Sequence, residues 1–224
     1  MAQTLIVVPV LNESATLAEQ LSRLSEYREQ GAEVVLVDGG SADNTREMVR
    51  AAGFMLIDSE RGRALQMNAG ARAVSSDVLI FLHADTRLPT GALVQVEQHL
   101  RRDRQWGRFD VQITGASAWL AVIACLMNIR SRLTGIATGD QTLFMTREAF
   151  DTVGGFPVQP LMEDIEMSKR LKRLSPPVCL SARVETSGRR WEQHGVWKTI
   201  LLMWRLRWAY WRGTPASELA RLYR

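Results

Sequence analysis

Residues 79–86 read Leu79-Ile80-Phe81-Leu82-His83-Ala84-Asp85-Thr86 and indicate the architecture of the chain. The apolar run predicts a buried strand, and Asp85 follows at its carboxyl end, where open α/β sheets bind ligands. Two further acidic sites accompany it: Asp38 follows the apolar run 34–37, and Glu163-Asp164 follows residues 160–162. We expect these acidic residues to converge on one cleft for a nucleotide, a divalent metal and a proton acceptor.

Strand-like apolar runs alternate with helical patterns, which predicts an α/β fold with a mixed, mostly parallel sheet flanked by helices. The expected strands are Leu5–Pro9, Glu33–Asp38, Phe54–Ile57, Asp77–Leu82, Phe109–Ile113, Gln141–Met145 and Val178–Leu180. The expected helices are one from about Ser14, Asp43–Ala52, Arg63–Val74, Thr90–Arg102, Ala116–Leu133 and Glu163–Leu174. Because no low-complexity linker divides the chain, we expect one domain over residues 1–190 and a helical tail over residues 191–224.

The composition of the 224-residue chain is that of a globular protein, with 46% hydrophobic and 23% charged residues. Cys125 and Cys179 are too few for a disulfide framework and match no metal-ligand spacing, so we expect a reducing compartment, the cytoplasm. The segment Thr4–Pro9 lacks a basic leader and is expected to be a first strand, not a signal peptide. The longest apolar stretch, Ala116–Ile129, is shorter than the roughly 20 residues that span a bilayer.

Two turns after expected strands are candidates for holding a nucleoside. Pro9 and Glu13 belong to a turn between the first strand and the first helix, where backbone groups and the Glu13 carboxylate can hold a base and ribose. Asp38 is followed by two glycines that allow close approach of the backbone, and its carboxylate can accept from a uracil N–H. The alternatives are a plain connection capped by Ser14 and an Asp-capped turn.

The next candidates bind phosphate and metal. Arg61 and Arg63 open a helix, and a helix amino terminus with Arg is suited to phosphate, although a solvated first turn is the alternative. His83 and Asp85 lie on one side of the extended chain, and Asp85 is the expected ligand of Mn²⁺ or Mg²⁺ together with a diphosphate. The alternative for Asp85 is a helix-capping role at the strand end.

The acidic pair Glu163-Asp164 begins a helix, and a carboxylate there can take a proton from an attacking hydroxyl. The alternative is a favourable charge at a helix start, which contributes about 0.3–1 kcal/mol. The turn Gly139-Asp140-Gln141 precedes an expected strand and either frames an acceptor or is an ordinary turn.

The tail from residue 189 onward carries eight Lys and Arg residues against two Glu, so it accounts for the positive charge of a chain whose net charge is +4. Five of the seven Trp residues lie between Trp191 and Trp211, and on a helix Trp197, Trp204, Trp208 and Trp211 form one stripe with Leu201. Aromatic and basic residues together favour a membrane interface. The alternatives are a packed helix or an oligomer contact, and nucleic acid ranks below them because acidic residues dominate the expected cleft.

Taken in order, five motifs resemble those of the family 2 glycosyltransferases of GT-A fold, in particular a small bacterial branch with a Phe81–Thr86 motif of this kind. The motifs are Pro9-Val10-Leu11-Asn12-Glu13, Asp38-Gly39-Gly40-Ser41, His83-Ala84-Asp85-Thr86, Gly154-Gly155-Phe156-Pro157 and Glu163-Asp164. The resemblance covers roughly residues 4–175. It implies a single nucleotide-diphospho-sugar transferase domain that transfers a sugar with inversion from an activated donor, commonly a UDP-sugar, with a divalent metal.

The resemblance also implies a role for each matching position. The donor nucleotide-sugar would be held by Pro9, Glu13, Asp38, Arg63, Asn68, Ala84 and Asp85, with the metal on Asp85. The general base would be Asp164. Apart from the resemblance, we expect Gly139, Asp140, Gln141 and Glu163 on the acceptor side. His83 departs from the usual Asp-x-Asp metal motif. Residues 187–191 resemble only loosely a motif of processive polysaccharide synthases, so we expect transfer of a single sugar. The acceptor is unidentified. If the tail contacts a membrane, we expect a lipid-linked acceptor. The rival hypothesis is a non-catalytic nucleotide-binding module that recruits a partner to membranes.

Overall fold

The structure is a computed structural model that describes residues 2–223, including all of their side chains except those of residues 190, 193 and 194. The strands are β1 Thr4–Val10, β2 Glu33–Asp38, β3 Met55–Asp58, β4 Val78–Phe81, β5 Thr86–Arg87, β6 Trp106–Thr114, β7 Leu143–Thr146 and β8 Val178–Ser187. The first helices are α1 Ser14–Glu29, α2 Thr45–Ala51, α3 Arg63–Ala73, α4 Ala92–His99 and α5 Trp119–Thr134. The later ones are the 3₁₀ helix η1 Gly139–Gln141, α6 Arg147–Thr152, α7 Glu163–Leu171, α8 Arg189–His194, α9 Val196–Trp211 and α10 Ala216–Leu222.

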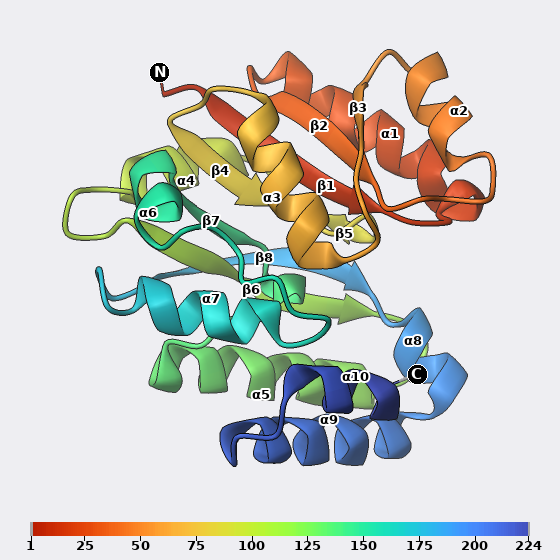
Figure 1. The fold of residues 1–224 in the computed structure, drawn as a ribbon, viewed down its shortest axis with the longest axis vertical. Coiled ribbons are helices and arrows are strands. Elements are labelled where there is room, and N and C mark those ends of the chain that lie inside the picture. Colours follow the sequence, from red (N-terminus) through yellow and green to blue (C-terminus); the bar gives the residue numbers. More distant parts are fainter. Residues whose placement is uncertain (1, 224) are drawn as a thin grey trace.

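All the strands join in one sheet with the order β3-β2-β1-β4-β7-β6-β8-β5 (Figure 1). The pairs of β1 with β2, β1 with β4 and β2 with β3 are parallel, whereas β7 is antiparallel to both β4 and β6. The long pair of β6 and β8 is again parallel. The predicted α/β fold with a mixed, mostly parallel sheet flanked by helices is therefore confirmed.

Helices cover both faces of this sheet because alternate residues of its strands are apolar on both sides. On β1, Ile6 and Val8 join a core with α1, α2, α4 and α5, while Leu5 and Val7 join a second core with α3, α6 and α7. Gly70 lets α3 approach the sheet, since a Cβ atom there would lie 2.5 Å from Val7.

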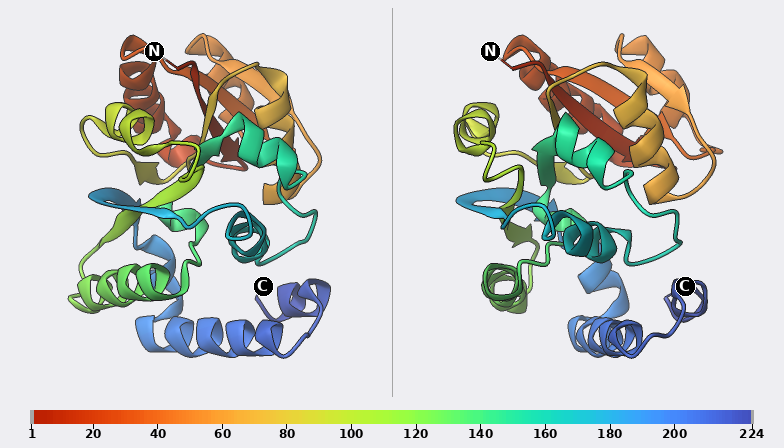
Figure 2. Two further views of the ribbon diagram at one scale, coloured as in Figure 1. Left: turned by 90° about the vertical axis from the view of Figure 1, so that its left-hand side faces the viewer. Right: turned by 60° about the vertical axis from the view of Figure 1, so that its left-hand side comes forward.

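The carboxyl-terminal helices form the end of the molecule opposite β1–β3 (Figures 1 and 2). A third, smaller cluster holds them in place, in which Leu206 of α9 and Leu219 of α10 pack on Met162, just before α7. The packed faces of α9 and α10 are thus continuous with the segment that carries the acidic pair. Over residues 2–223, no helix combines the length and apolar character needed to cross a bilayer.

Several expected boundaries were wrong. β8 continues to Ser187 instead of ending at Leu180, and its pairing with β6 has a register shift between Phe109 and Asp110. Gln141 belongs to a 3₁₀ helix instead of a strand, and α7 ends at Leu171. The short elements β5 and α6 were not expected. β5 exists only through its antiparallel pairing with the far end of β8.

Candidate active site

The ends of the parallel strands β1, β2 and β4 place their following turns at one edge of the sheet. The register sets this arrangement, because Val10 at the end of β1 pairs with Asp38 at the end of β2, and Val7 pairs with Phe81 at the end of β4. The second half of the chain brings η1, the start of α7 and the end of β8 to the same edge, where two adjoining cavities open.

We call the first cavity the strand-side cavity. It has a volume of about 320 Å³ and is lined by Pro9, Val10, Leu11, Glu13, Arg61, Gly62, Arg63, Gln66, His83, Ala84 and Asp85. These residues end or follow β1, follow β4, or lie at the start of α3. The cavity therefore forms at the switch between β1 and β4, where ligands bind in open α/β sheets.

We call the second cavity the tail-side cavity. It has a volume of about 160 Å³, and its core lining comprises Thr138, Gly139, Asp140, Glu163, Asp164, Thr186 and Ser187. The tail contributes Trp191, Thr199, Met203, Arg207 and Tyr223. Arg63, His83 and Asp85 line both cavities. A ligand that contacts these three residues can therefore reach from one cavity into the other.

Asp164 lies in the first turn of α7 and faces the tail-side cavity. One carboxylate oxygen accepts from the Gly139 backbone N–H at 2.9 Å, and the other accepts from the Ile165 N–H at 2.7 Å. Burial raises the pKa of Asp164, against the effect of these two hydrogen bonds. Burial also raises the pKa of Glu163, and the neighbouring charge of Asp164 adds to it. A carboxylate with a raised pKa is a better proton acceptor than one with an ordinary pKa.

The backbone beside this pair is unusual. Met162 has a φ angle of 65°, in the left-handed region that non-glycine residues rarely adopt. Its side chain packs on Leu206 and Leu219, which holds the conformation in place. The start of α7, and with it Glu163 and Asp164, is therefore fixed by a strained residue whose support comes from the tail.

His83 and Asp85 leave β4 in different environments. His83 is buried, and its Nδ1 lies 3.4 Å from a carboxylate oxygen of Asp140. Its ring packs so closely on Gly139 that a Cβ atom there would lie 2.4 Å away, so this position requires glycine. Asp85 is exposed at the junction of the two cavities. The carboxylate available to a ligand at this junction is that of Asp85, whereas His83 supports η1.

One ion pair connects distant segments across the site, and Arg63 lies near several carboxylates between the cavities. Arg189 at the start of α8 lies 3.9 Å from the carboxylate of Glu13 in the first turn. Burial raises the pKa of Glu13, and the charge of Asp85 adds to this while Arg189 opposes it. The side chain of Arg63 is exposed to solvent and lies near Glu163. Burial lowers the pKa of Arg63, but the nearby carboxylates raise it more, so the net pKa is above the ordinary value. Arg63 is therefore a permanent cation between the cavities.

A divalent metal fits this site only if a substrate completes its coordination. Among the described residues, no group of three or more His, Cys, Asp and Glu side chains could hold an ion alone. Asp85 offers an exposed carboxylate, and the effect of its charge on the pKa of Glu13 indicates a second carboxylate nearby. One or two carboxylates plus substrate phosphates is a common arrangement for Mg²⁺, so these donors suit an ion that arrives with a diphosphate.

Nine of the twelve expected site residues line one or both cavities, and three do not. Asp38 is buried, and its carboxylate accepts from the backbone N–H groups of Gly40 and Ser41 at 2.9 Å, so it closes its own turn instead of facing the cavity. The expectation that Asp38, Asp85 and Asp164 meet in one hollow was therefore wrong for Asp38.

Asn68 and Gln141 also serve the scaffold. Asn68 is buried and exchanges two hydrogen bonds of 2.8 Å with the backbone of Phe156, which fixes the loop before α7. Gln141 turns away from the cavity and donates to Ser131 of α5 at 2.9 Å. Their amide groups are used by the protein and are not offered to a ligand.

Other residues that line the cavities were not expected. Gln66 is buried on α3 and donates to the carbonyl groups of Val10 and Val37, at 2.9 and 2.8 Å, which ties the ends of β1 and β2 together. Its position three residues after Arg63, one turn along the same helix face, is the signal that could have identified it. The lining residues of the tail had no such signal, because α9 reaches the cavity only through the tertiary fold.

Comparison with known proteins identifies the family and supports the fold of the chain. The family described as Glycosyl transferase family 2 matches residues 5–151, well over half of the chain. The chain belongs to glycosyl transferase family 2. The matched residues include β1, β2 and β4 and the strand-side cavity, whereas α7 and the tail lie beyond them.

Curated relatives include the poly-β-1,6-N-acetyl-D-glucosamine synthases of Staphylococcus aureus and Staphylococcus epidermidis, each 26% identical over 212 residues. The alignments cover 83% of this chain and 51% of each synthase, so the chain spans about half the length of these relatives.

Solved structures show the same fold at lower identity. A mannosyltransferase from Pyrobaculum calidifontis, solved with GDP-Man and Mn²⁺, is 20% identical with a TM-score of 0.66, covering 93% of this chain and 61% of that one. TarS of S. aureus (residues 1–349) with UDP-GlcNAc is 17% identical, with a TM-score of 0.64 and coverages of 83% and 58%. Glucosyl-3-phosphoglycerate synthase of Mycobacterium tuberculosis, solved with Mn²⁺ and UDP, is 18% identical with a TM-score of 0.60, covering 83% and 71%.

Proposed function

We propose that this family 2 protein is a glycosyltransferase that moves one sugar, with inversion, from a nucleotide-diphosphate donor to an acceptor hydroxyl. The observation that carries the proposal is the shared wall of the two cavities. Asp85 and Arg63 line both, and Asp164, with its raised pKa, faces only the tail-side cavity. A donor bound on one side and an acceptor on the other would meet at these residues.

The donor would occupy the strand-side cavity. Its nucleoside would contact Pro9 and Glu13, and its diphosphate would lie near Arg63 and Asp85, with Ala84 beside it. Arg63 would stabilise the charge that develops on the leaving diphosphate, as a guanidinium does for phosphate oxygens. A UDP-sugar is our first choice, because the solved relatives include complexes with UDP-GlcNAc and UDP-glucose.

The acceptor would occupy the tail-side cavity. Its hydroxyl would give its proton to Asp164, and its oxygen would form a bond to the anomeric carbon. The bond from that carbon to the diphosphate oxygen would break on the opposite face, and its electron pair would leave with the diphosphate. Attack opposite to departure inverts the anomeric configuration. Gly139 orients Asp164 through its backbone N–H, and Asp140 and Glu163 complete the acceptor side.

Mn²⁺ or Mg²⁺, bound by Asp85 and the donor diphosphate, would supply neutralisation of the charge on the leaving group. Mn²⁺ accompanies the nucleotide in the solved mannosyltransferase and in glucosyl-3-phosphoglycerate synthase. The choice between the two ions is open to measurement.

The proposal also includes where the enzyme works. We place it in the cytoplasm at the inner face of the membrane, where Trp197, Trp204, Trp208 and Trp211 would contact lipid and the acceptor would be lipid-linked. The exposure of all four Trp side chains supports the lipid contact.

A panel of UDP- and GDP-sugars tests the proposed function. Each would be added to the full chain with and without Mn²⁺. Thermal shift is the binding readout, and release of the nucleotide diphosphate, with water taking the sugar in place of the acceptor, is the reaction readout. We expect one donor class to raise the melting temperature with Mn²⁺ and to be consumed. Vesicle binding without consumption of any nucleotide-sugar would favour the rival hypothesis, a non-catalytic module that recruits a partner to membranes.

A further inference from the structure

Two helices distant in the sequence expose most of the large apolar side chains on the described surface. Of fifteen exposed large hydrophobic residues, ten belong to α5 and α9. On α5 they are Trp119, Val122, Leu126, Ile129 and Leu133, and on α9 they are Trp197, Leu201, Trp204, Trp208 and Trp211. Their exposed fractions range from 45% to 81%. Spacings of three and four residues put each set along one side of its helix.

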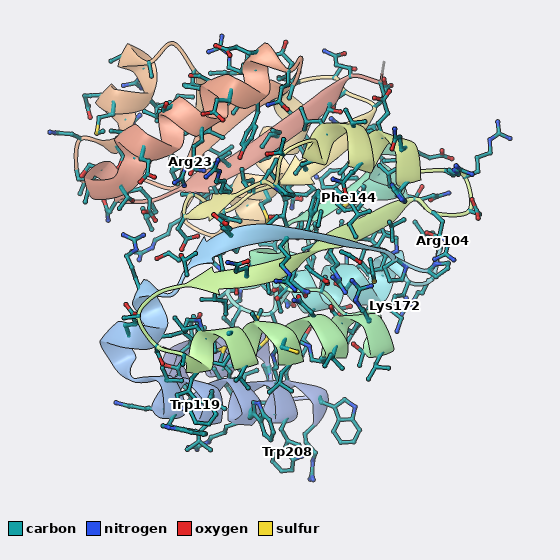
Figure 3. All side chains as sticks on the ribbon, turned by 180° about the vertical axis from the view of Figure 1, so that it is seen from behind. Arg23, Arg104, Trp119, Phe144, Lys172 and Trp208 are labelled. Carbon is teal, nitrogen blue, oxygen red and sulfur yellow. The ribbon has the colours of Figure 1, made fainter. Side chains whose placement is uncertain are left out.

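The two stripes meet at the amino ends of the helices. The rings of Trp119 and Trp197 lie edge to face with centroids 4.7 Å apart. Behind them, Ile200 of α9 packs against the same core as Leu120 of α5. Figure 3 shows Trp119 and Trp208 at the same end of the molecule, beside these helices. The stripes therefore form one continuous apolar surface, which we call the α5–α9 surface.

The charged side chains within α5 and α9 all have the same sign. Neither helix contains an Asp or a Glu, whereas α9 carries the exposed cations Lys198 and Arg205 and is followed by Arg212, which lies over the Trp208 ring. On a helix that turns about 100° per residue, these three cations lie along one edge of the Trp stripe. Apolar side chains bordered by cations match a bilayer with anionic headgroups, in which Trp rests at headgroup depth.

A second copy of the chain suits the surface less well. In a two-fold contact the same patch occurs on both partners. The cations along α9 would then face one another with no acidic residue in either helix to compensate them, and like charges in an interface are unfavourable. An anionic lipid surface removes this conflict.

We propose that α5 and α9 together form a docking surface that lies in the interface of an anionic bilayer. The opposite side of α9 provides Thr199, Met203 and Arg207 to the tail-side cavity. A helix is about 10 Å across, so docking would bring that cavity to within about one helix diameter of the lipid. On the proposed function, this deepens the assignment of the acceptor, whose hydroxyl would belong to a lipid-anchored molecule at headgroup level.

Vesicle binding by surface variants tests this proposal. The full chain would be sedimented with phosphatidylcholine vesicles that either contain or lack phosphatidylglycerol. One variant replaces Trp204 and Trp208 with Glu, and a second replaces Leu126 and Ile129 of α5 with Glu. Each lost apolar anchor should weaken binding by about tenfold or more, and binding of the wild type should weaken as salt rises.

A control variant replaces Val94 and Val158 with Glu, since these side chains are equally exposed but lie outside the α5–α9 surface. It should sediment like the wild type. Thermal melts and consumption of a soluble nucleotide-sugar show that each variant is folded, because none of these residues lines the strand-side or the tail-side cavity.

Three results would overturn the proposal. The first is no binding to anionic vesicles, and the second is equal binding by the α5 variant and the wild type. The third is a wild-type dimer that does not bind vesicles and that dissociates in both the α5 and the α9 variant. Vesicle binding that persists without turnover of any nucleotide-sugar would leave the docking surface standing and reject the proposed function instead.

Discussion

Replacing Asp164 with Asn removes the proposed proton acceptor and changes little else at that position. The Asn side chain has the same shape and retains one oxygen for the N–H of Gly139 or Ile165. A positioned general base contributes about 10²–10⁴-fold to a rate, which corresponds to about 2.7–5.4 kcal/mol of barrier at 1.36 kcal/mol per tenfold change. We expect kcat to fall by that factor.

Stability and donor binding should separate this loss from misfolding. The lost hydrogen bond costs about 1 kcal/mol. Removal of a buried charge beside Glu163 opposes that cost, because burial raises both pKa values and the charge of Asp164 raises the pKa of Glu163 further. The melting temperature should therefore change by only a few degrees. The proposed donor site is the other cavity, so the Kd of the donor should be unchanged.

The assay measures release of the nucleotide diphosphate, with calorimetry for donor affinity. Glu163→Gln is the matched control, because Glu163 is an adjacent carboxylate in the same cavity. A turnover of Asp164→Asn within about threefold of the wild type, far below the expected general-base factor, would refute the assignment. A larger loss in Glu163→Gln than in Asp164→Asn would transfer the role to Glu163.

Three further predictions concern metal, stability and pH. Asp85→Ala should abolish the enhancement of donor binding by Mn²⁺, and equal affinity with Mn²⁺ and with EDTA in the wild type would contradict the metal role. Gln66→Leu should lower the free energy of unfolding by about 1–3 kcal/mol because two buried carbonyl groups lose a donor; in urea titrations, the exposed control Gln98→Leu should change it by less than about 0.5 kcal/mol. The pKa values of Glu163 and Asp164 are raised in the folded protein above the ordinary values of 4.5 and 3.8. Above these values the folded state therefore binds more protons than the unfolded state, and the contribution of the two carboxyl groups to stability falls as pH rises from about 4. Activity should rise over the same range as the base ionises, and a melting-temperature difference between Asp164→Asn and the wild type that does not grow with pH would argue against the raised pKa.

Much of the fold could be predicted because its first half is built from local signals. Between β1 and β4, each buried strand is a continuous apolar run and each connection is short, so alternation alone indicates a parallel sheet. β8 carries weaker signals, since its exposed residues include Arg183 and Glu185. Its length depends on pairing with β6, some 70 residues earlier, which no local pattern encodes.

The candidate site could likewise be predicted from the sequence only in part. Residues directly after a strand were placed at the correct edge of the sheet by position alone, as Asp85 illustrates. Whether a polar side chain faces a ligand or its own loop depends on hydrogen bonds that the sequence does not display. Asp38, Asn68 and Gln141 are polar residues of this kind, and each is used by the scaffold.

Because α9 both lines the tail-side cavity and carries the Trp stripe, shortening the chain there would change the cavity and the exposed apolar surface at once. Removing the last thirty residues to gain solubility would also open the tail-side cavity to bulk water. It would remove the packing behind Met162, which fixes the start of α7. A shortened protein that no longer turns over would therefore reveal nothing about lipid. Only point substitutions on the outer side of α9 can separate the two roles.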